Sequence, residues 1–451
     1  MVEQKLSDES TGGGTDQIPS PKGLPLLGHI RPFKRDPLEF YVETAQEYGP
    51  VARFQLGQRE FIQLSDPEYV EHVLVHNNDA YVKGREFREM LEPIVGNGII
   101  ATDGEEWRSQ RRLLEPAFHP EEIERYSTVV TDIVERHCDQ WRDGEVRDIQ
   151  DEMLALTTEI IAKTLFDIDI RDERDEIAGS LDTVMSYSAI QMRRPIEVPS
   201  WVPTPGNRKF ERAVENLNDV ADRIIDQYQT DNIEGATIVS LLQGAEESLP
   251  RQEIRNQVLS FLIAGYETTQ LALTYTLQLL SKHPQKLDRL QSELADVLGG
   301  NAPTMTDLPQ LTYLEKVMKE SLRIYPPIPG TTREATEDDE IGGYHIPEGS
   351  VVAFQQWAIH RDPEYFEEPE TFRPERWSDG FEAELPPFAY FPFGGGPHKC
   401  MGERFAKMEM YLVLGTLLQD WEFETTLDEL SFVPSITNRH DGPIEMVLRR
   451  C

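Results

Sequence analysis

A cysteine near the C-terminal end of the chain carries the clearest chemical signal. Residues 393–402 read FGGGPHKCMG and place Cys400 just before an expected helix, which the apolar stripe of Phe405, Met408 and Leu412 predicts. At that position backbone N–H groups and the positive end of the helix dipole favour a thiolate over a thiol. The glycines allow the backbone to approach a flat partner closely. The pattern therefore predicts a special role for this sulfur.

Other common sites that contain glycines or cysteines do not fit this segment. A P-loop would need Gly-Lys-Ser/Thr after the glycines, and a zinc site would need a second cysteine nearby. The chain has only Cys138, Cys400 and Cys451, which excludes a disulfide scaffold and favours a reducing compartment. A lone cysteine is usually a small buried hydrophobe, so the surrounding pattern carries the interpretation.

Residues 393–402 resemble the haem-binding loop of the cytochrome P450 family, F-G-x-G-x-H-x-C-x-G, at every fixed place. The resemblance implies that the cofactor is haem b (iron protoporphyrin IX) and that Cys400 is the axial ligand of its iron. It also implies that His398 hydrogen-bonds a haem propionate and that Phe393 and Gly402 contact the cofactor. Thiolate ligation pushes electron density onto the iron and favours O–O cleavage.

A second unusual segment, residues 264–269 (AGYETT), lies in the middle of a long apolar stretch. Glycine costs about 1 kcal/mol inside a helix, and an unpaired buried carboxylate costs more. A solvent-facing acidic turn is the plain alternative. The segment resembles the family's A-G-x-E-T oxygen-activation signature. The resemblance assigns Thr268 to a hydrogen bond with iron-bound peroxide and Glu267 to a proton relay through water, with Ala264 leaving space for substrate.

Glu320 and Arg323 share one face of an expected helix, a spacing that usually marks a solvated surface pair. Together with residues 372–377 (FRPERW) they resemble the family's E-x-x-R and P-E-R-F elements. The resemblance implies a buried structural triad of Glu320, Arg323 and Arg376 beneath the cysteine loop. Trp377 stands where the family usually has Phe.

Further cofactor and substrate contacts follow from the same resemblance. Residues 107–111 (WRSQR) resemble a W-x-x-x-R element, and we assign Trp107, Arg111 and Arg333 to the propionates because arginine holds carboxylates by charge-assisted bonds. Taken alone, an arginine pair on a helix is usually a solvated face. By family position, substrate contacts are expected at Ala264, at Ile328 and in residues 87–100, 192–201 and 434–436.

The elements that must position these residues predict a mainly α-helical fold with a small β subdomain. Residues 18–28 should run extended, residues 54–64 should form a hairpin, and residues 67–299 should be mostly helical. Strand patterns return at residues 340–354 and 444–448, so strands from both chain ends must meet. We expect a disordered acidic Gly/Ser tail at residues 1–17 and one cytochrome P450-like domain at residues 18–451. The haem would lie between the long central helix and the helix after Cys400.

The composition excludes some classes of binding partner and indicates the environment in which the protein works. The 451 residues include 44 Lys plus Arg against 81 Asp plus Glu, a formal net charge of -37, which argues against binding to nucleic acid or an acidic lipid surface. No run of 18 apolar residues predicts a membrane span, and no secretion signal is evident. We expect a cytoplasmic monomer from a halophilic archaeon, because concentrated salt screens self-repulsion.

The resemblance implies a haem-thiolate monooxygenase, which inserts one oxygen atom from O2 into a small apolar molecule. Electrons from NAD(P)H would pass through a reductase and a separate ferredoxin or flavodoxin, docking near a basic island of Lys399, Arg404 and Lys407. A peroxide-driven hydroxylase is one alternative, although it would not need Glu267 and Thr268. A non-catalytic haem sensor or carrier is another, although it would normally carry an additional signalling module.

The charge balance leads to a first prediction. Raising the KCl concentration from millimolar to molar should raise the thermal unfolding midpoint, because the screening length falls from about 30 Å to a few ångströms. A midpoint that falls as KCl is added would contradict the halophilic assignment.

Overall fold

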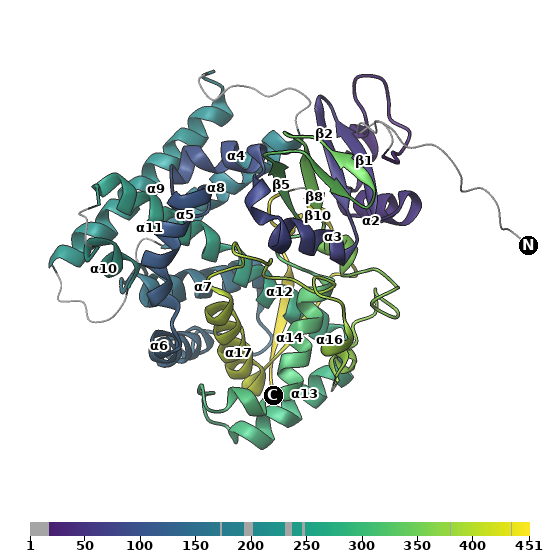
Figure 1. The fold of residues 1–451 in the computed structure, drawn as a ribbon. Helices are drawn as coiled ribbons and strands as arrows, with labels where there is room; N and C mark the ends of the chain where they lie inside the picture. The colour runs from purple at the N-terminus through teal and green to yellow at the C-terminus, as the bar shows by residue number, and fades with distance from the viewer. Residues whose placement is uncertain are drawn as a thin grey trace, which may run out of the picture.

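The computed structural model describes residues 18–171, 174–193, 202–230, 237–245, 249–378, 380–433 and 435–451 (Figure 1). The predicted tail at residues 1–17 lies outside this description. So do residues 194–201 and residue 434, which belong to predicted substrate segments.

Helices dominate the described chain, as the sequence predicts (Figure 1). The α-helices are α1 (Ile30–Arg35), α2 (Pro37–Tyr48), α3 (Pro67–Glu71), α4 (Arg85–Val95), α5 (Gly104–Leu114), α6 (Pro120–Cys138), α7 (Ile149–Leu165), α8 (Arg174–Arg193), α9 (Pro205–Thr230), α10 (Ile238–Gln243), α11 (Arg251–Tyr266), α12 (Thr268–Ser281), α13 (Pro284–Leu298), α14 (Thr312–Ile324), α15 (Gln356–Ile359), α16 (Phe381–Glu384) and α17 (Glu403–Asp420). Shorter turns are the π-helix η2 (His72–His76) and the 3₁₀ helices η3 (Asn78–Ala80), η4 (Glu115–Phe118), η5 (Leu308–Gln310) and η6 (Pro374–Trp377). Within the described residues, no helix is both long enough and apolar enough to cross a membrane.

The strands are short and form four small sheets. They are β1 (Val51–Leu56), β2 (Arg59–Leu64), β3 (Tyr81–Lys83), β4 (Val146–Asp148), β5 (Thr331–Ala335), β6 (Asp339–Ile341), β7 (Tyr344–Ile346), β8 (Val351–Phe354), β9 (Trp421–Thr425), β10 (Phe432–Val433), β11 (Arg439–His440) and β12 (Glu445–Arg450). The largest sheet has the order β1-β2-β8-β5-β3, and the others are β4-β12-β9, β6-β7 and β10-β11.

The sheet topology confirms the predicted hairpin and corrects one expectation. Strands β1 and β2 pair antiparallel, with Phe54 opposite Phe61, and the extended segment before them lies along β1, where Arg53 N–H donates to the Pro19 carbonyl at 2.7 Å. This sheet joins the N-terminal hairpin to β5 and β8. The last strand, β12, pairs instead with β4 and β9. The strands of the two chain ends therefore meet only in part.

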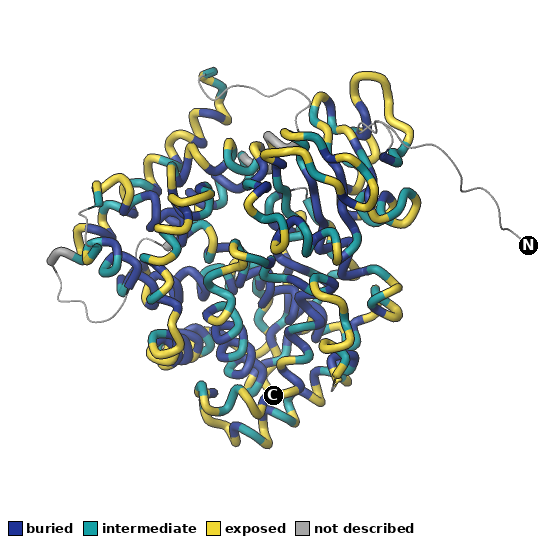
Figure 2. The backbone as a smooth tube through the Cα atoms, viewed as in Figure 1, coloured by how far each residue is buried: buried dark blue, intermediate teal, exposed yellow. Residues whose placement is uncertain are grey.

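Buried residues gather in the middle of the molecule, and the outer turns of the surrounding helices are exposed (Figure 2). Consecutive helices α11 and α12 cross this core and are separated only at Glu267. On α12 nearly every side chain is buried, from Thr269 to Leu280. The predicted long central helix is therefore present, with an interruption at its polar segment.

The predicted triad is assembled and buried. The Glu320 carboxylate lies 2.9 Å from Arg323 Nη2 and 2.8 Å from Arg376 Nε, and Glu320 and Arg323 have no solvent exposure. Trp377, in place of the family's usual Phe, donates its indole N–H to Glu320 Oε2 at 2.9 Å. Burial alone would raise the pKa of Glu320, but the two guanidinium groups hold that pKa below its ordinary value.

The triad extends toward the segment that precedes the cysteine loop. Arg323 Nη1 donates to the His360 carbonyl oxygen at 2.8 Å, and the backbone N–H of Phe391 donates to His360 Nε2 at 3.1 Å. Two hydrogen bonds thus connect the ion cluster to the chain just before residue 393. The buried charge cluster therefore helps to position the cysteine loop, although none of its three side chains belongs to that loop.

Replacing Glu320 by Ala should lower the free energy of unfolding by about 3–5 kcal/mol, because two buried arginines lose their anion. Trp377→Phe, the matched control, removes one hydrogen bond and should cost only about 1 kcal/mol. Denaturant unfolding measures both. The contribution of Glu320 should be complete above the pKa of the unfolded carboxyl and disappear as the pH falls through the lower folded pKa. If the two variants have the same free energy of unfolding, the ion pairs of the triad do not stabilise the fold.

Candidate functional site

A cavity of about 1500 Å³ lies between the central helix and the cysteine loop. Its wall includes Ala264 and Thr268 from the central helix, Ile328 and Arg333 from the segment after α14, and Phe393, His398 and Cys400 from the cysteine loop. Residues far apart in sequence therefore meet at one place, as predicted. The lining does not include four of the predicted site residues, Trp107, Arg111, Glu267 and Gly402.

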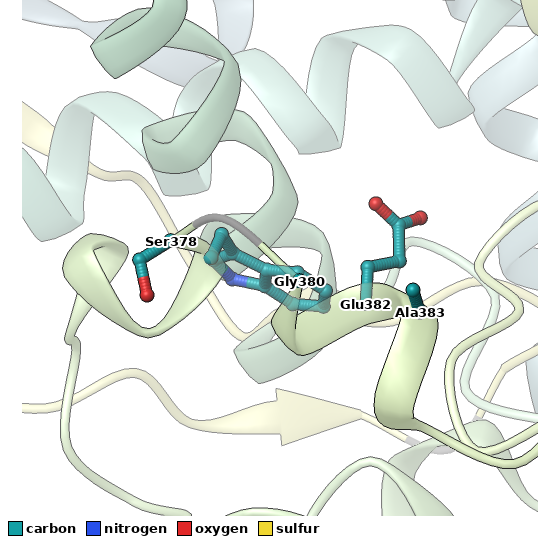
Figure 3. A pocket seen from close by; sticks show the side chains of 5 residues that line it. Ser378, Gly380, Glu382 and Ala383 are labelled. Carbon is teal, nitrogen blue, oxygen red and sulfur yellow. The ribbon is translucent and has the colours of Figure 1, made fainter.

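A second, smaller pocket lies elsewhere and contains none of these residues. It is lined by Trp377, Ser378, Gly380, Glu382 and Ala383 beside α16 (Figure 3). Figure 3 shows the Ser378 and Glu382 side chains lying apart, with neither pointing toward the other. We find no convergent set of polar groups there, so the large cavity is the candidate site.

The cysteine loop is shaped by its glycines and presents Cys400 to the cavity. Gly396 has φ +63°, and a Cβ atom there would meet the Leu74 carbonyl oxygen at 1.8 Å, so no other residue fits. The Cys400 N–H donates to the Phe393 carbonyl at 2.9 Å, and α17 begins at Glu403. The Cys400 side chain is exposed toward the cavity.

The electrostatics of the sulfur differ from the simple helix-dipole expectation. Burial within the protein raises the pKa of Cys400, and the Gly402 N–H lowers it by a smaller amount. The backbone N–H group therefore lowers the pKa of the thiol, as expected, but the effect of desolvation is larger. A thiolate here needs a cationic partner such as a metal ion. Among the described residues no group of three or more His, Cys, Asp or Glu could hold a bare metal ion.

Cationic and aromatic side chains gather at one end of the cavity. The Trp107 and His398 rings lie 3.9 Å apart between centroids, and the Arg111 guanidinium lies 5.5 Å from the Trp107 ring. Arg111 also donates to the Lys399 carbonyl at 2.9 Å. Burial and the nearby cations lower the pKa of His398 to about 3, so its ring is neutral, and its Nδ1 atom has no hydrogen-bond partner among the described residues.

Arg333 is the strongest sign that an anion belongs at this end. It forms no ion pair with any residue in the described ranges, and its nearest acceptor is the Thr332 carbonyl at 2.9 Å from Nη1. Burial lowers its pKa to about 10, against a smaller opposing effect of Asp103. Lys83, which we did not single out from sequence, is buried beside it and donates to the Ile99 and Thr102 carbonyls. A partly buried and a buried cation that form no ion pair within the described residues fit the carboxylates of a haem.

The central helix contributes the Thr268 hydroxyl to the cavity wall and contains a glycine, Gly265, against which another helix packs. Thr268 Oγ1 donates to the Ala264 carbonyl at 2.9 Å, four residues back, and both residues line the cavity. A Cβ atom on Gly265 would lie 2.5 Å from Ile161 Cδ1, so this glycine allows α7 to pack closely. The glycine has a packing reason that the sequence alone does not reveal.

Glu267 lies on a different side of the helix from the cavity. Its carboxylate accepts a hydrogen bond from Thr437 Oγ1 at 2.6 Å and lies 2.7 Å from Arg439 Nε. Burial raises the pKa of Glu267, and Arg439 acts in the opposite direction. Arg439 and Thr437 come from a segment whose sequence carries no signal that links it to the central helix. Thr437 lines the cavity, so it stands between Glu267 and the open space.

Parts of the predicted substrate segments line the cavity, and their contact with a substrate stays a prediction. Phe87 and Ile100 line the cavity with Ile328, and so does Ile436. Further apolar lining that we did not predict comes from Met185, Phe210 and Ile263 on the helices and from Phe33 near the N-terminal end. Their spacing is that of ordinary core positions, so only the fold identifies them.

Comparisons with known proteins agree with this geometry. The family model "Cytochrome P450" matches residues 18–440. The chain is 36% identical over 409 residues to "Cyclooctatin synthase" of Streptomyces melanosporofaciens, and the match covers 89% of this chain and 89% of the relative. It is 33% identical over 434 residues to "Cyclooctat-9-en-7-ol 5-monooxygenase" of the same organism (95% of this chain, 94% of the relative). It is 30% identical over 407 residues to "Pentalenene oxygenase" of Streptomyces avermitilis (89% and 90%).

Arg333→Met should speed the loss of haem to a competing apoglobin by roughly 10–100-fold, because one charged hydrogen bond to a propionate is worth about 1.5–3 kcal/mol. The transfer is followed by absorbance. Arg289→Met, which removes an exposed cation paired with Glu375, is the control and should leave the rate unchanged. Equal rates in both variants would show that Arg333 does not hold the cofactor.

Proposed function

The chain belongs to the cytochrome P450 family, and we propose that it hydroxylates a bulky apolar molecule with electrons delivered by a separate small redox protein. It is a cytochrome P450 monooxygenase whose cofactor is haem b, and it works with an organic substrate and a redox partner. The observation that carries the proposal is the cavity that has the Cys400 sulfur on one side and the Thr268 hydroxyl in its wall.

The residues around the cavity fit the cofactor. In the proposal Cys400 binds the iron, and Arg333, His398, Trp107 and Arg111 hold the propionates. Phe393 and Gly402 support the ring beside the sulfur. The unpaired Arg333 guanidinium and the free His398 Nδ1 support this arrangement, since both lack partners that an anionic edge would supply. When bound, the haem supplies the electron-transfer and oxygen chemistry that amino-acid side chains lack.

Thr268 is proposed to position protons on the cavity side of the central helix. Because its hydroxyl hydrogen points to the Ala264 carbonyl at 2.9 Å, its oxygen is free to accept a hydrogen bond from a water in the cavity. Rotation of the hydroxyl would convert it into a donor. Ala264 presents only a methyl group there, which leaves room for the substrate.

Glu267 is proposed to take part in the same proton supply from outside the cavity wall. Its carboxylate is held by Arg439 and Thr437, so a proton that leaves Glu267 must pass Thr437 or follow a rotation of the acid. Arg439 also pairs with Asp182 on α8 at 2.6 Å, which extends the network to a half-exposed side chain. This is a longer route than a direct acid and alcohol pair.

The substrate class is inferred from the lining and from the relatives. Apolar side chains such as Phe87, Met185, Phe210 and Ile263 surround the space next to Ala264. Two relatives carry names that refer to pentalenene and cyclooctat-9-en-7-ol. We infer a cyclic terpenoid hydrocarbon or its simple alcohol, whose rigid apolar skeleton suits this lining.

The redox partner is proposed to be a ferredoxin or flavodoxin, reduced by NAD(P)H through its reductase. The predicted basic island is present but partly neutralised, because Glu403 lies 2.6 Å from Lys399 Nζ and 2.7 Å from Lys407 Nζ. Arg404 is exposed on the first turn of the same helix, so the three cations of the proposed docking island outnumber Glu403. The proposal also keeps the protein monomeric and cytoplasmic, where a reducing environment suits three free cysteines.

Thr268→Ala should leave haem binding intact but divert electrons to hydrogen peroxide. With pentalenene, a surrogate ferredoxin and its reductase, the yield of hydroxylated product per NADPH should fall by about tenfold or more, because a positioned proton donor contributes about 10²–10⁴ in rate. Product and peroxide are measured together.

Thr336→Ala, an exposed position, is the matched control and should couple normally. Cys400→Ser should abolish the absorption signature of the reduced carbon monoxide complex that marks a thiolate-ligated haem. Normal coupling in Thr268→Ala would remove the proton assignment, and full turnover with peroxide alone would favour the peroxide-driven alternative.

A further inference from the structure

A polar turn forms one part of the wall of the largely apolar cavity. Residues 435–438 lie between β10 and β11, and all four line the cavity. Their sequence is Ser-Ile-Thr-Asn, so three of the four carry polar side chains. Ser435 falls in a segment that is expected to contact the substrate, but Asn438 lies beyond it.

Two of these polar side chains lack a partner. Thr437 donates its hydroxyl to the Glu267 carboxylate at 2.6 Å. In contrast, Ser435 Oγ and Asn438 Nδ2 have no hydrogen-bond partner among the described residues, although the two residues are only 8% and 2% exposed. Buried polar groups are costly to leave unpaired. We therefore expect a molecule in the cavity to supply the missing partner.

The main chain holds Asn438 in place from two directions. Its N–H donates to the Pro327 carbonyl oxygen at 2.7 Å, and its carbonyl oxygen accepts a hydrogen bond from the Tyr275 hydroxyl on α12. Pro327 also lines the cavity. Asn438 would have to break both hydrogen bonds to leave this position, so its amide stays at the wall.

The chemical types of the two groups define the ligand that would satisfy them. The Asn438 amide nitrogen only donates hydrogen bonds, and the Ser435 hydroxyl donates or accepts. Both groups therefore fit an oxygen atom with lone pairs, as in an alcohol or a ketone. A carboxylate fits less well, because the neighbouring Arg439 is already paired with Glu267 and Asp182.

We propose that Ser435 and Asn438 determine substrate specificity by binding a neutral oxygen atom of the substrate. The inference rests on the proposed monooxygenase function and narrows its substrate class to a terpenoid alcohol or ketone. A hydrocarbon of the same shape fits the apolar lining but leaves both polar groups unpaired. A reaction that installs this first oxygen atom, such as a cyclisation that ends with the addition of water, must therefore precede the step that this enzyme catalyses.

Binding of this oxygen atom also orients the substrate. When one end of a rigid molecule is fixed at residues 435–438, only some of its carbon atoms can come close to Ala264 and Thr268 in another part of the wall. The hydrogen bonds form between neutral groups, so no proton or electron moves in this recognition step.

Two probes that share one skeleton test the proposal. The haem-loaded full chain is dialysed to equilibrium against decalin or 2-decalol, which differ by one hydroxyl group, and both dissociation constants are measured. Asn438→Leu and Ser435→Ala each remove one polar group. In each variant the preference for 2-decalol over decalin should fall by roughly 3–10-fold relative to wild type, because one neutral hydrogen bond is lost. The comparison of ratios cancels the different transfer of the two probes from water.

Two further variants separate recognition of the oxygen atom from general effects on the fold. Asn218→Leu on α9 removes a half-buried amide that donates to the Val214 carbonyl at 2.9 Å and does not line the cavity, so the ratio should stay at the wild-type value. Ser435→Thr keeps the hydroxyl group and should retain most of the preference. Haem absorbance and thermal unfolding show whether each variant is loaded and folded.

The possible results distinguish recognition of the substrate from a purely structural role. An unchanged ratio in both Asn438→Leu and Ser435→Ala would overturn the proposal and indicate that a fixed water molecule satisfies the two groups. Failure of the loaded wild type to bind 2-decalol would overturn it as well. A wild type without the thiolate signature of the reduced carbon monoxide complex would instead contradict the proposed function, so the two failures are distinguishable.

Discussion

A carboxylate held between two buried guanidinium groups anchors the part of the chain that presents the cysteine. Glu320 binds Arg323 and Arg376, and Arg323 reaches the His360 carbonyl, whose imidazole accepts from the Phe391 N–H. Removing these charges from water costs several kcal/mol per ion, so the cluster is stable only when every member is in place. The position of the cysteine loop therefore depends on α14, on η6 and on the segment between them.

The site is defined as much by charges that lack partners as by those that have them. Among the described residues Arg333 forms no ion pair and donates only to neutral oxygens, the Thr332 carbonyl at 2.9 Å and Thr331 Oγ1 at 3.4 Å. Lys83 donates to two carbonyl oxygens, although both cations lie in a protein with a net charge of -37. By contrast, the buried Glu267 carboxylate forms an ion pair with Arg439. A buried cation without an anion persists when a ligand supplies the anion, which is why these residues identify a haem-sized cavity more firmly than its volume does.

Desolvation acts on two ionisable groups at helix α17. Just before the helix begins, it raises the pKa of the Cys400 thiol, so a cationic partner is needed to favour the thiolate. Within the helix, the Glu409 side chain is fully buried, its carboxylate oxygens have no hydrogen-bond partner among the described residues, and burial raises its pKa to about 8. Desolvation thus disfavours the charged form of both groups. Neither effect is visible in the residue types alone.

The sequence by itself indicated the fold class, and its resemblance to the cytochrome P450 family indicated the cysteine loop and the members of the triad, because the family's motifs are local patterns with fixed spacings. It also identified Thr268 and Glu267 as polar residues in an apolar helix, but not their directions. Consecutive residues on a helix point about 100° apart, so Thr268 faces the cavity while Glu267 turns to Arg439. Lys83 and Arg439 acquired their places in the site only from tertiary packing, since the effect of a charge depends on what surrounds it in space, and distant segments supply those surroundings.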